Sequence, residues 1–80
     1  MLPLDYSRMA ELGGELQTLG LDDWRLRLEK AVSTPGTEID AGMAIRHTLR
    51  ELLASKTPLP AEVREIASNL FQELGKALRS

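Results

Sequence analysis

The chain has 80 residues, of which 42% are hydrophobic and 28% charged, with a net charge of −2 and no cysteine. This length and composition predict one globular domain spanning residues 1–80 and exclude disulfide bonds, thiolate metal sites and intrinsic disorder. No hydrophobic run approaches the roughly 18 residues of a membrane span, and the N-terminus has no secretory pattern, so we expect a cytoplasmic protein that does not enter a membrane.

The hydrophobic residues are mostly leucine and alanine, and β-branched residues are scarce. Leucine and alanine favour helices, whereas β-branched and aromatic residues favour strands. The composition and the helical spacing of the hydrophobic residues predict an all-α fold. We expect a small four-helix bundle, or a three-helix bundle if the first helix frays, with a C-terminal antiparallel helical hairpin.

The first predicted helix covers about residues 6–19. Asp5 precedes it as a candidate N-cap, and Leu4 can pack on Met9 as a hydrophobic staple. Gly20 follows it in the position of a left-handed C-terminal stop, with Leu21 folding back as in a Schellman motif.

Gly13 and Gly14 interrupt this helix, although each internal glycine costs about 1 kcal/mol relative to alanine. They indicate a close helix–helix crossing, mild fraying, or a hinge that lets residues 1–12 move on binding. A phosphate-binding loop is not expected, because no strand precedes the pair and no Gly-Lys-Ser/Thr sequence follows it.

The second predicted helix covers about residues 23–32 and follows the first after a very short connection, so the two helices should be neighbours. Asp22 is its candidate N-cap. Acidic residues near its start and Lys30 near its end suit the helix dipole.

The third and fourth predicted helices cover about residues 38–56 and 60–78 and form the hairpin. Thr37 and Asp40 have the spacing of a capping box at the start of the third helix. Pro58 ends that helix, and Pro60 suits the first position of the fourth. The hydrophobic stripe of the third helix is Ile39, Met43, Ile45, Leu49, Leu52 and Leu53. That of the fourth is wider than a coiled-coil seam: Val63, Ile66, Ala67, Leu70, Phe71, Leu74, Ala77 and Leu78.

No residue pattern identifies an enzyme. His47 is the only histidine, and it lacks the neighbouring ligands of a metal site and the nucleophile of a catalytic triad. The carboxylate pairs Glu11/Glu15 and Glu62/Glu65 lie on single helix faces, where such pairs usually solvate the surface. We therefore predict no catalytic, cofactor-binding or metal-binding residue.

Arg46, His47 and Arg50 on the third helix suggest an alternative function, that of a small DNA-binding transcriptional regulator. The sequence pI of about 5.3 argues against it, because nucleic-acid-binding domains are usually basic. Arginine is also common at protein–protein interfaces.

The favoured hypothesis is a non-enzymatic protein–protein interaction module, such as a regulator, adaptor, chaperone or immunity-type protein, with another protein or a second copy as its partner. It would bury a hydrophobic groove between the third and fourth helices against that partner. Met43 and Phe71 fit either a core or an exposed groove. The predicted partner-binding residues are Arg46, Leu49, Arg50, Leu53, Leu70, Phe71, Glu73 and Leu74.

Overall fold

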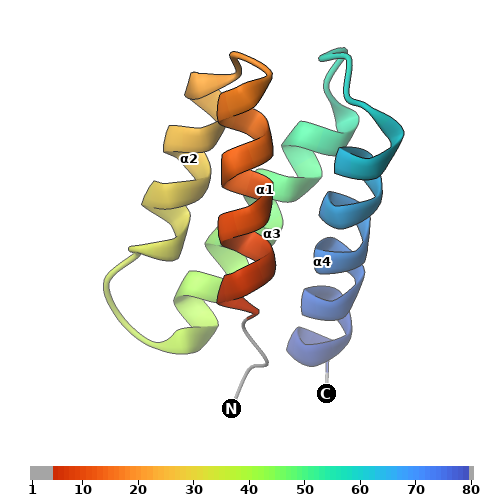
Figure 1. The fold of residues 1–80 in the computed structure, drawn as a ribbon. Coiled ribbons are helices and arrows are strands. Elements are labelled where there is room, and N and C mark those ends of the chain that lie inside the picture. The colour runs from red at the N-terminus through yellow and green to blue at the C-terminus, as the bar shows by residue number, and fades with distance from the viewer. Residues whose placement is uncertain (1–4, 80) are drawn as a thin grey trace.

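The computed structural model describes residues 5–79, which form four α-helices and no strand (Figure 1). The helices are α1 (Tyr6–Thr18), α2 (Asp22–Val32), α3 (Glu38–Ala54) and α4 (Ala61–Arg79). The predicted all-α four-helix bundle is confirmed, and each helix boundary lies within two residues of its prediction. The first helix is formed, so the three-helix alternative does not apply.

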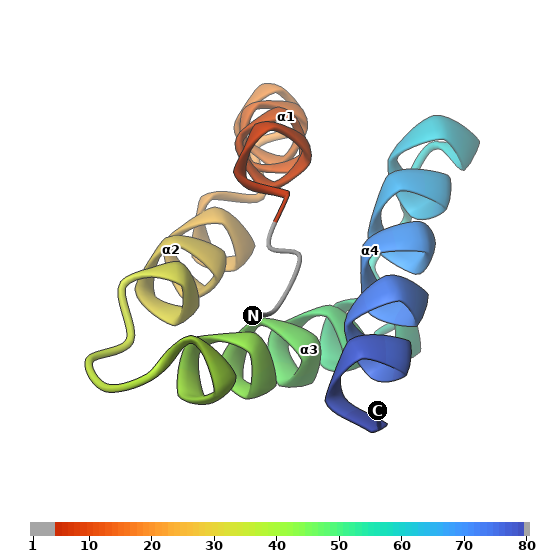
Figure 2. The same cartoon turned by 90° about the horizontal axis from the view of Figure 1, so that it is seen from below.

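The helices form a ring in which each packs against its neighbours in the sequence. Contacts join α1 to α2, α2 to α3, α3 to α4, and α4 back to α1. Seen from below, α3 runs across the bundle from α2 to α4, and α1 lies on the opposite side (Figure 2). The helices α3 and α4 run in opposite directions as the predicted hairpin (Figure 1).

The predicted ends of α1 are confirmed. The Asp5 side chain accepts a hydrogen bond from the Arg8 amide at 3.1 Å. Gly20 has φ of 75°, and the Leu21 amide donates to the Leu16 carbonyl at 2.8 Å, which is the long hydrogen bond of a Schellman motif. The proposed staple by Leu4 lies outside the described residues.

The prediction that Asp22 caps the second helix is wrong. The helix begins at Asp22 itself, Leu21 is the N-cap residue, and no side chain caps it. The Leu21 carbonyl already accepts from the Arg25 amide at 3.1 Å, because the Schellman motif brings the chain directly into the next helix. Asp22 and Asp23 in the first turn still suit the helix dipole.

The predicted capping box at the start of α3 is confirmed. The Asp40 amide donates to Thr37 Oγ1 at 3.2 Å, and Asp40 Oδ2 accepts from the Thr37 amide at 3.1 Å. The helix ends at Ala54, two residues before the predicted end. Pro60 precedes α4 rather than starting it, and its carbonyl accepts from the Arg64 amide at 3.0 Å.

The core contains hydrophobic residues from all four helices. Leu12 and Leu16 of α1 are almost completely buried against residues of the other helices. This burial of the α1 stripe explains why the first helix is stable despite its two glycines. The buried core residues are Met9, Leu12, Leu16, Leu28, Ala31, Ile45, Leu49, Leu52, Val63, Ala67, Leu70 and Leu74.

Gly13 and Gly14 do not mark a close helix–helix crossing, and that expectation is wrong. A Cβ atom added at either position would have no neighbour within 4 Å. The helix is continuous through both residues, and neither has a positive φ. Packing therefore does not require glycine at either position. The hinge hypothesis remains a prediction.

Substituting these glycines should stabilise the protein. We expect Gly13→Ala and Gly14→Ala each to raise the free energy of unfolding by about 0.5–1 kcal/mol, since alanine restricts the unfolded chain and fits the helix. Urea unfolding followed by circular dichroism would measure the change. Gly20→Ala is the matched control, because its positive φ should make that substitution destabilising. A loss of stability at position 13 or 14 would contradict the prediction.

Candidate interaction surface

The helix α3 presents large hydrophobic side chains on two different sides. Its inner side includes Ile45, Leu49 and Leu52, each no more than 2% exposed. Ile39 and Met43 are on another side and are 55% and 58% exposed. At about 100° per residue, these two lie roughly 120° around the helix from the inner residues. The hydrophobic residues predicted to form one stripe on this helix therefore lie on two sides, one buried in the core and one exposed.

Ile39 and Met43 belong to a surface that also carries positive charge. Residues 39, 43, 46 and 50 follow one another at spacings of four, three and four, which places them along one side of a helix. With α4 they line a shallow hollow of about 390 Å³. We call this surface the α3 outer face and define it by Ile39, Met43, Arg46, His47, Arg50 and Leu78.

Arg46 is fixed at the boundary between α3 and α4. Its guanidinium carbon lies 4.8 Å from the centroid of the Phe71 ring, in a cation–π arrangement. Its Nε atom is buried without a hydrogen-bond partner. A Cβ atom at Gly75 would lie 3.4 Å from Arg46 Nε and 3.6 Å from Arg79 Nη2. The missing side chain at Gly75 therefore lets two guanidinium groups approach the same point on α4.

Arg79 adds positive charge beside Arg46. Its Nε donates to the Gly75 carbonyl at 3.1 Å, an arrangement that suits a cation at a helix C-terminus. Arg50 is exposed, and no hydrogen bond or ion pair engages it within residues 5–79. The surface around Arg46 is therefore positively charged, although the chain as a whole is acidic.

A second group of charges connects α2 to α3 beside the outer face. Arg27 Nη2 lies 2.9 Å from Glu51 Oε2, and His47 Nε2 contacts the other oxygen of the same carboxylate. The Arg27 guanidinium lies over the Trp24 ring at 4.5 Å. The hydrogen bond from Arg27 is the main reason why the pKa of Glu51 is below its usual value of 4.5. The contact with Arg27 therefore favours the carboxylate form of Glu51.

The predicted partner-binding residues do not form one surface. Leu49, Leu70 and Leu74 are at most 2% exposed and belong to the core, so a partner could contact them only if the bundle opened. Leu53 and Phe71 are half-buried against that core.

The charged members of the predicted set are also separated. Arg46 and Arg50 lie on the α3 outer face. Glu73 is exposed on α4, about 160° around that helix from Gly75, the residue over which Arg46 lies.

Ile39 and Met43 are not among the predicted partner-binding residues, although the sequence left open whether Met43 lies in the core or in an exposed groove. Their angular separation from Ile45 and Leu49 on a helical wheel would have identified them, because a single side of the helix cannot hold all four.

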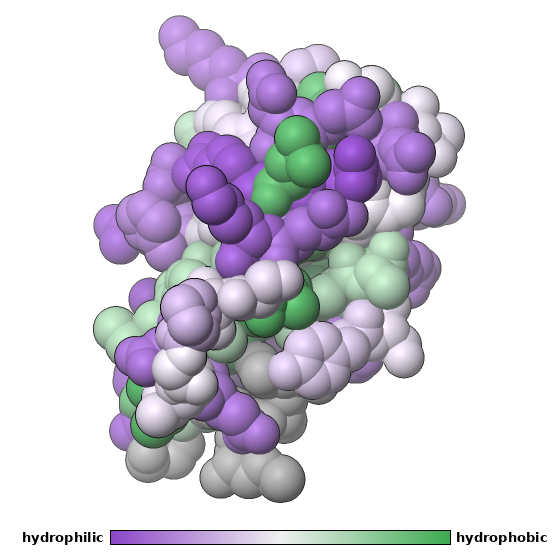
Figure 3. All heavy atoms as spheres, turned by 90° about the vertical axis from the view of Figure 1, so that its left-hand side faces the viewer, coloured by the Kyte–Doolittle hydropathy of each residue, from purple (hydrophilic) through white to green (hydrophobic). Residues whose placement is uncertain are grey.

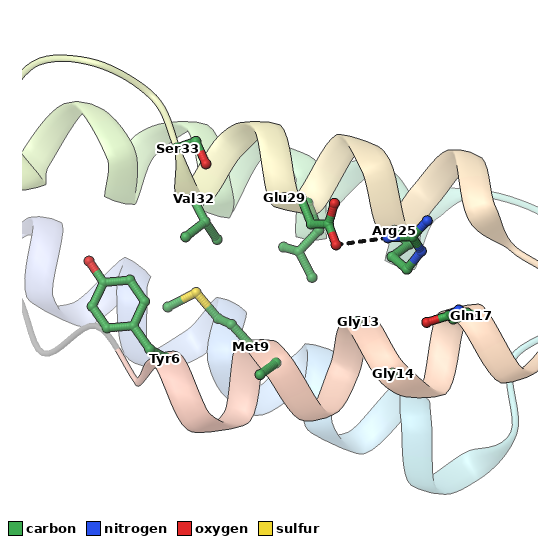
Figure 4. Close-up of a pocket in the computed structure, with 11 residues that line it drawn as sticks. Tyr6, Met9, Gly13, Gly14, Gln17, Arg25, Glu29, Val32 and Ser33 are labelled. Carbon is green, nitrogen blue, oxygen red and sulfur yellow. Dashed lines mark hydrogen bonds and ion pairs between the residues drawn. The ribbon is translucent and has the colours of Figure 1, made fainter.

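A larger hollow, of about 610 Å³, lies between α1 and α2, and we call it the α1–α2 groove. Gly13 and Gly14 line it, and Met9 and Val32 point into it from opposite sides (Figure 4). Arg25 and Glu29 form a 2.8 Å ion pair on its α2 side. From the α2 side the molecular surface is mostly hydrophilic. One hydrophobic side chain stands among hydrophilic ones in the upper part of the view, and others lie across its middle and at its lower left (Figure 3).

The carboxylate pairs predicted on α1 and α4 lie around one shallow hollow. Glu11, Glu15, Glu62 and Glu65 line it together with Arg8. Across residues 5–79, no cluster of three or more histidine, cysteine, aspartate or glutamate side chains is arranged to hold a metal ion. None of the helices in this range combines the length and hydrophobicity needed to cross a bilayer.

Comparisons with known proteins found no protein-family model, no curated protein and no solved structure that matches this chain.

Removing the Glu51 carboxylate should make stability less dependent on pH. A lowered pKa means that folding favours the charged form, so its stabilising effect is complete above pH 4.5 and is lost as the pH falls through the lowered value. We expect Glu51→Gln to lower the urea midpoint at neutral pH, with the difference from the wild type shrinking in acid. Glu65→Gln controls for the loss of one negative charge. A difference that does not change with pH would contradict this prediction.

Proposed function

We propose that this protein is a non-enzymatic interaction module, acting as a regulator or adaptor, that binds a protein partner through the α3 outer face. The observation that carries the proposal is the exposure of more than half of both Ile39 and Met43, which are neighbours on one side of a helix. Contiguous exposed hydrophobic side chains with a polar rim are typical of interaction sites. Methionine and arginine are both enriched at such sites.

The hydrophobic contribution alone supports only weak binding. Covering the exposed halves of Ile39 and Met43 contributes roughly 2 kcal/mol in total, taking half of the usual value for complete burial of each side chain. Association also costs translational, rotational and side-chain entropy. A partner must therefore use the arginines as well, and Arg46 is already partly ordered by its contact with Phe71.

The composition of the face favours a protein partner over DNA. Glu38 and Asp40 are exposed on the first turn of the same helix, where they would repel phosphate groups. The two large hydrophobic residues would also have no role in contacts with phosphates, which contribute most of the affinity of DNA-binding proteins. DNA binding through Arg46, His47 and Arg50 remains the alternative proposal.

Site-specific photocrosslinking in the cells that make this protein would test the proposed function. We expect a benzoylphenylalanine residue in place of Met43 to form an adduct with a protein, and Arg50→Glu in the same chain to reduce that adduct. The matched control is the same crosslinker in place of Leu26, which is 53% exposed on α2 and lies outside the α3 outer face.

Equal labelling from positions 43 and 26, or none from position 43, would refute the proposal. An adduct with nucleic acid from position 43 would support the DNA-binding alternative instead.

A further inference from the structure

Two arginine side chains approach one point on α4 without an acid between them. Arg46 Nε and Arg79 Nη2 would lie 3.4 and 3.6 Å from a Cβ atom added at Gly75. Within residues 5–79, neither arginine forms an ion pair with an acidic residue. Neighbouring guanidinium groups repel each other, so an anion placed beside them would be attracted by both.

The arginines of the α3 outer face differ in this respect from those of α1 and α2. Arg8, Arg25 and Arg27 each form an ion pair with an acid of the same chain. Arg46 and Arg50, one helical turn apart on α3, have no acidic partner in the part of the chain that the structure describes. The cations without an acidic partner on α3 are therefore those beside its exposed hydrophobic side chains.

These arginines and the hydrophobic residues form a narrow stripe. At about 100° per residue, positions 39, 43, 46 and 50 lie within an arc of roughly 60°. From position 39 to position 50 the stripe is about 16 Å long. Ile39 and Met43 occupy its N-terminal half, and Arg46 and Arg50 its C-terminal half. A complementary ligand therefore has hydrophobic groups at one end and anionic groups at the other.

We propose that the α3 outer face binds an acidic amphipathic helix of a partner protein. Two carboxylates one turn apart would face the arginines, and two hydrophobic side chains would cover Ile39 and Met43. This inference rests on the proposed function, because it names the partner of the same surface. Guanidinium groups bind carboxylates through charge-assisted hydrogen bonds that are frequently bidentate.

A helix fits this face better than an extended segment. The face presents only side chains, because the backbone groups of α3 bond within the helix, so an extended partner would gain no backbone hydrogen bonds from it. The arginines lie nearer the C-terminus of α3. In a partner helix antiparallel to α3, the carboxylates then lie near the N-terminus, where they suit that helix's own dipole. The expected order along the partner is two acids followed by two hydrophobic residues.

Acidic residues beside the stripe disfavour broader anionic partners. Asp40 and Glu51 lie roughly 80–100° around α3 from Arg50. A DNA duplex or an anionic bilayer covers a wide area and would meet these carboxylates, whereas a helix can contact the stripe alone. Asp40 is about 15 Å from Arg50 along the helix, beyond the roughly 8 Å over which exposed charges interact at physiological salt. It therefore does not oppose an acid beside Arg50.

A designed peptide would test this proposal. The probe is an acetylated peptide, held helical by a lactam bridge on its opposite side, with two glutamates followed by two leucines at spacings of four, three and four positions. Fluorescence anisotropy at low salt measures its binding. We expect the same peptide with lysine in place of both glutamates to bind at least tenfold more weakly. Added salt should weaken binding of the acidic peptide, since exposed ion pairs are screened.

Variants of the protein would identify the face. Arg50→Glu should weaken binding of the acidic peptide at least tenfold, and a peptide with lysine in place of its first glutamate should recover binding to this variant. The matched control is Arg64→Glu, which should change binding less than twofold, because Arg64 is exposed on α4 outside the α3 outer face. Met43→Glu should also weaken binding, whereas Leu26→Glu should not. Circular dichroism would confirm that each variant is folded.

The outcomes distinguish the two proposals. Failure of the acidic peptide to bind, equal binding of the lysine peptide, or binding insensitive to Arg50→Glu and Met43→Glu would overturn the acidic-helix inference. So would tighter binding to a DNA duplex or to phosphatidylglycerol vesicles than to the peptide, or self-association of the wild type that Arg50→Glu abolishes. In each case, a position-43 adduct with a protein would leave the proposed function standing. Failure of the photocrosslinking would overturn both.

Discussion

The packing of α3 between α2 and α4 determines which surface the protein offers. In a ring of four helices, α3 contacts two neighbours and must bury Ile45, Leu49 and Leu52 between them. That requirement fixes the rotation of the helix about its own axis. Ile39 and Met43, which lie roughly 120° away around the helix, are then turned towards the outside. The candidate surface is therefore a direct consequence of core formation.

Local sequence signals predicted the elements of the fold well. The Asp5 cap, the Thr37–Asp40 capping box and the Gly20 stop each depend on residues within one turn of one another, so they can be recognised without tertiary information. The cap assigned to Asp22 was wrong because Leu21 serves two motifs: its amide closes the Schellman motif of α1, and it is the N-cap residue of α2. The Schellman motif of α1 brought the chain into α2 one residue early.

The candidate site was harder to predict than the fold. Leu49, Leu70 and Leu74 have the periodicity of a binding groove, but the same periodicity describes a core, and only the packing of four helices distinguishes the two. The position of Arg46 depends on Phe71 and Gly75. Both residues are more than 20 positions away in the sequence, so no local pattern indicates the contact.

The two glycines of α1 illustrate a different limit of sequence reasoning. A glycine pair inside a helix suggests that another backbone passes close by, yet at Gly13 and Gly14 there is open space. The α1–α2 groove exists partly because no side chain projects from these positions (Figure 4). The burial of Leu12 and Leu16 on the other side of α1 stabilises the helix, although the two glycines have a low helix propensity.

Interactions within the chain determine which charged side chains remain available to bind a partner. Glu51 lies on α3 next to Arg50, and as a free carboxylate it would weaken the positive end of the α3 outer face. Arg27 binds it from α2 at 2.9 Å and so places a positive charge beside it. Phe71 similarly holds Arg46 against α4, whereas Arg50 has no hydrogen-bond or ion-pair partner within residues 5–79. The charge pattern of the surface therefore arises partly from contacts with α2 and α4, outside the helix that presents it.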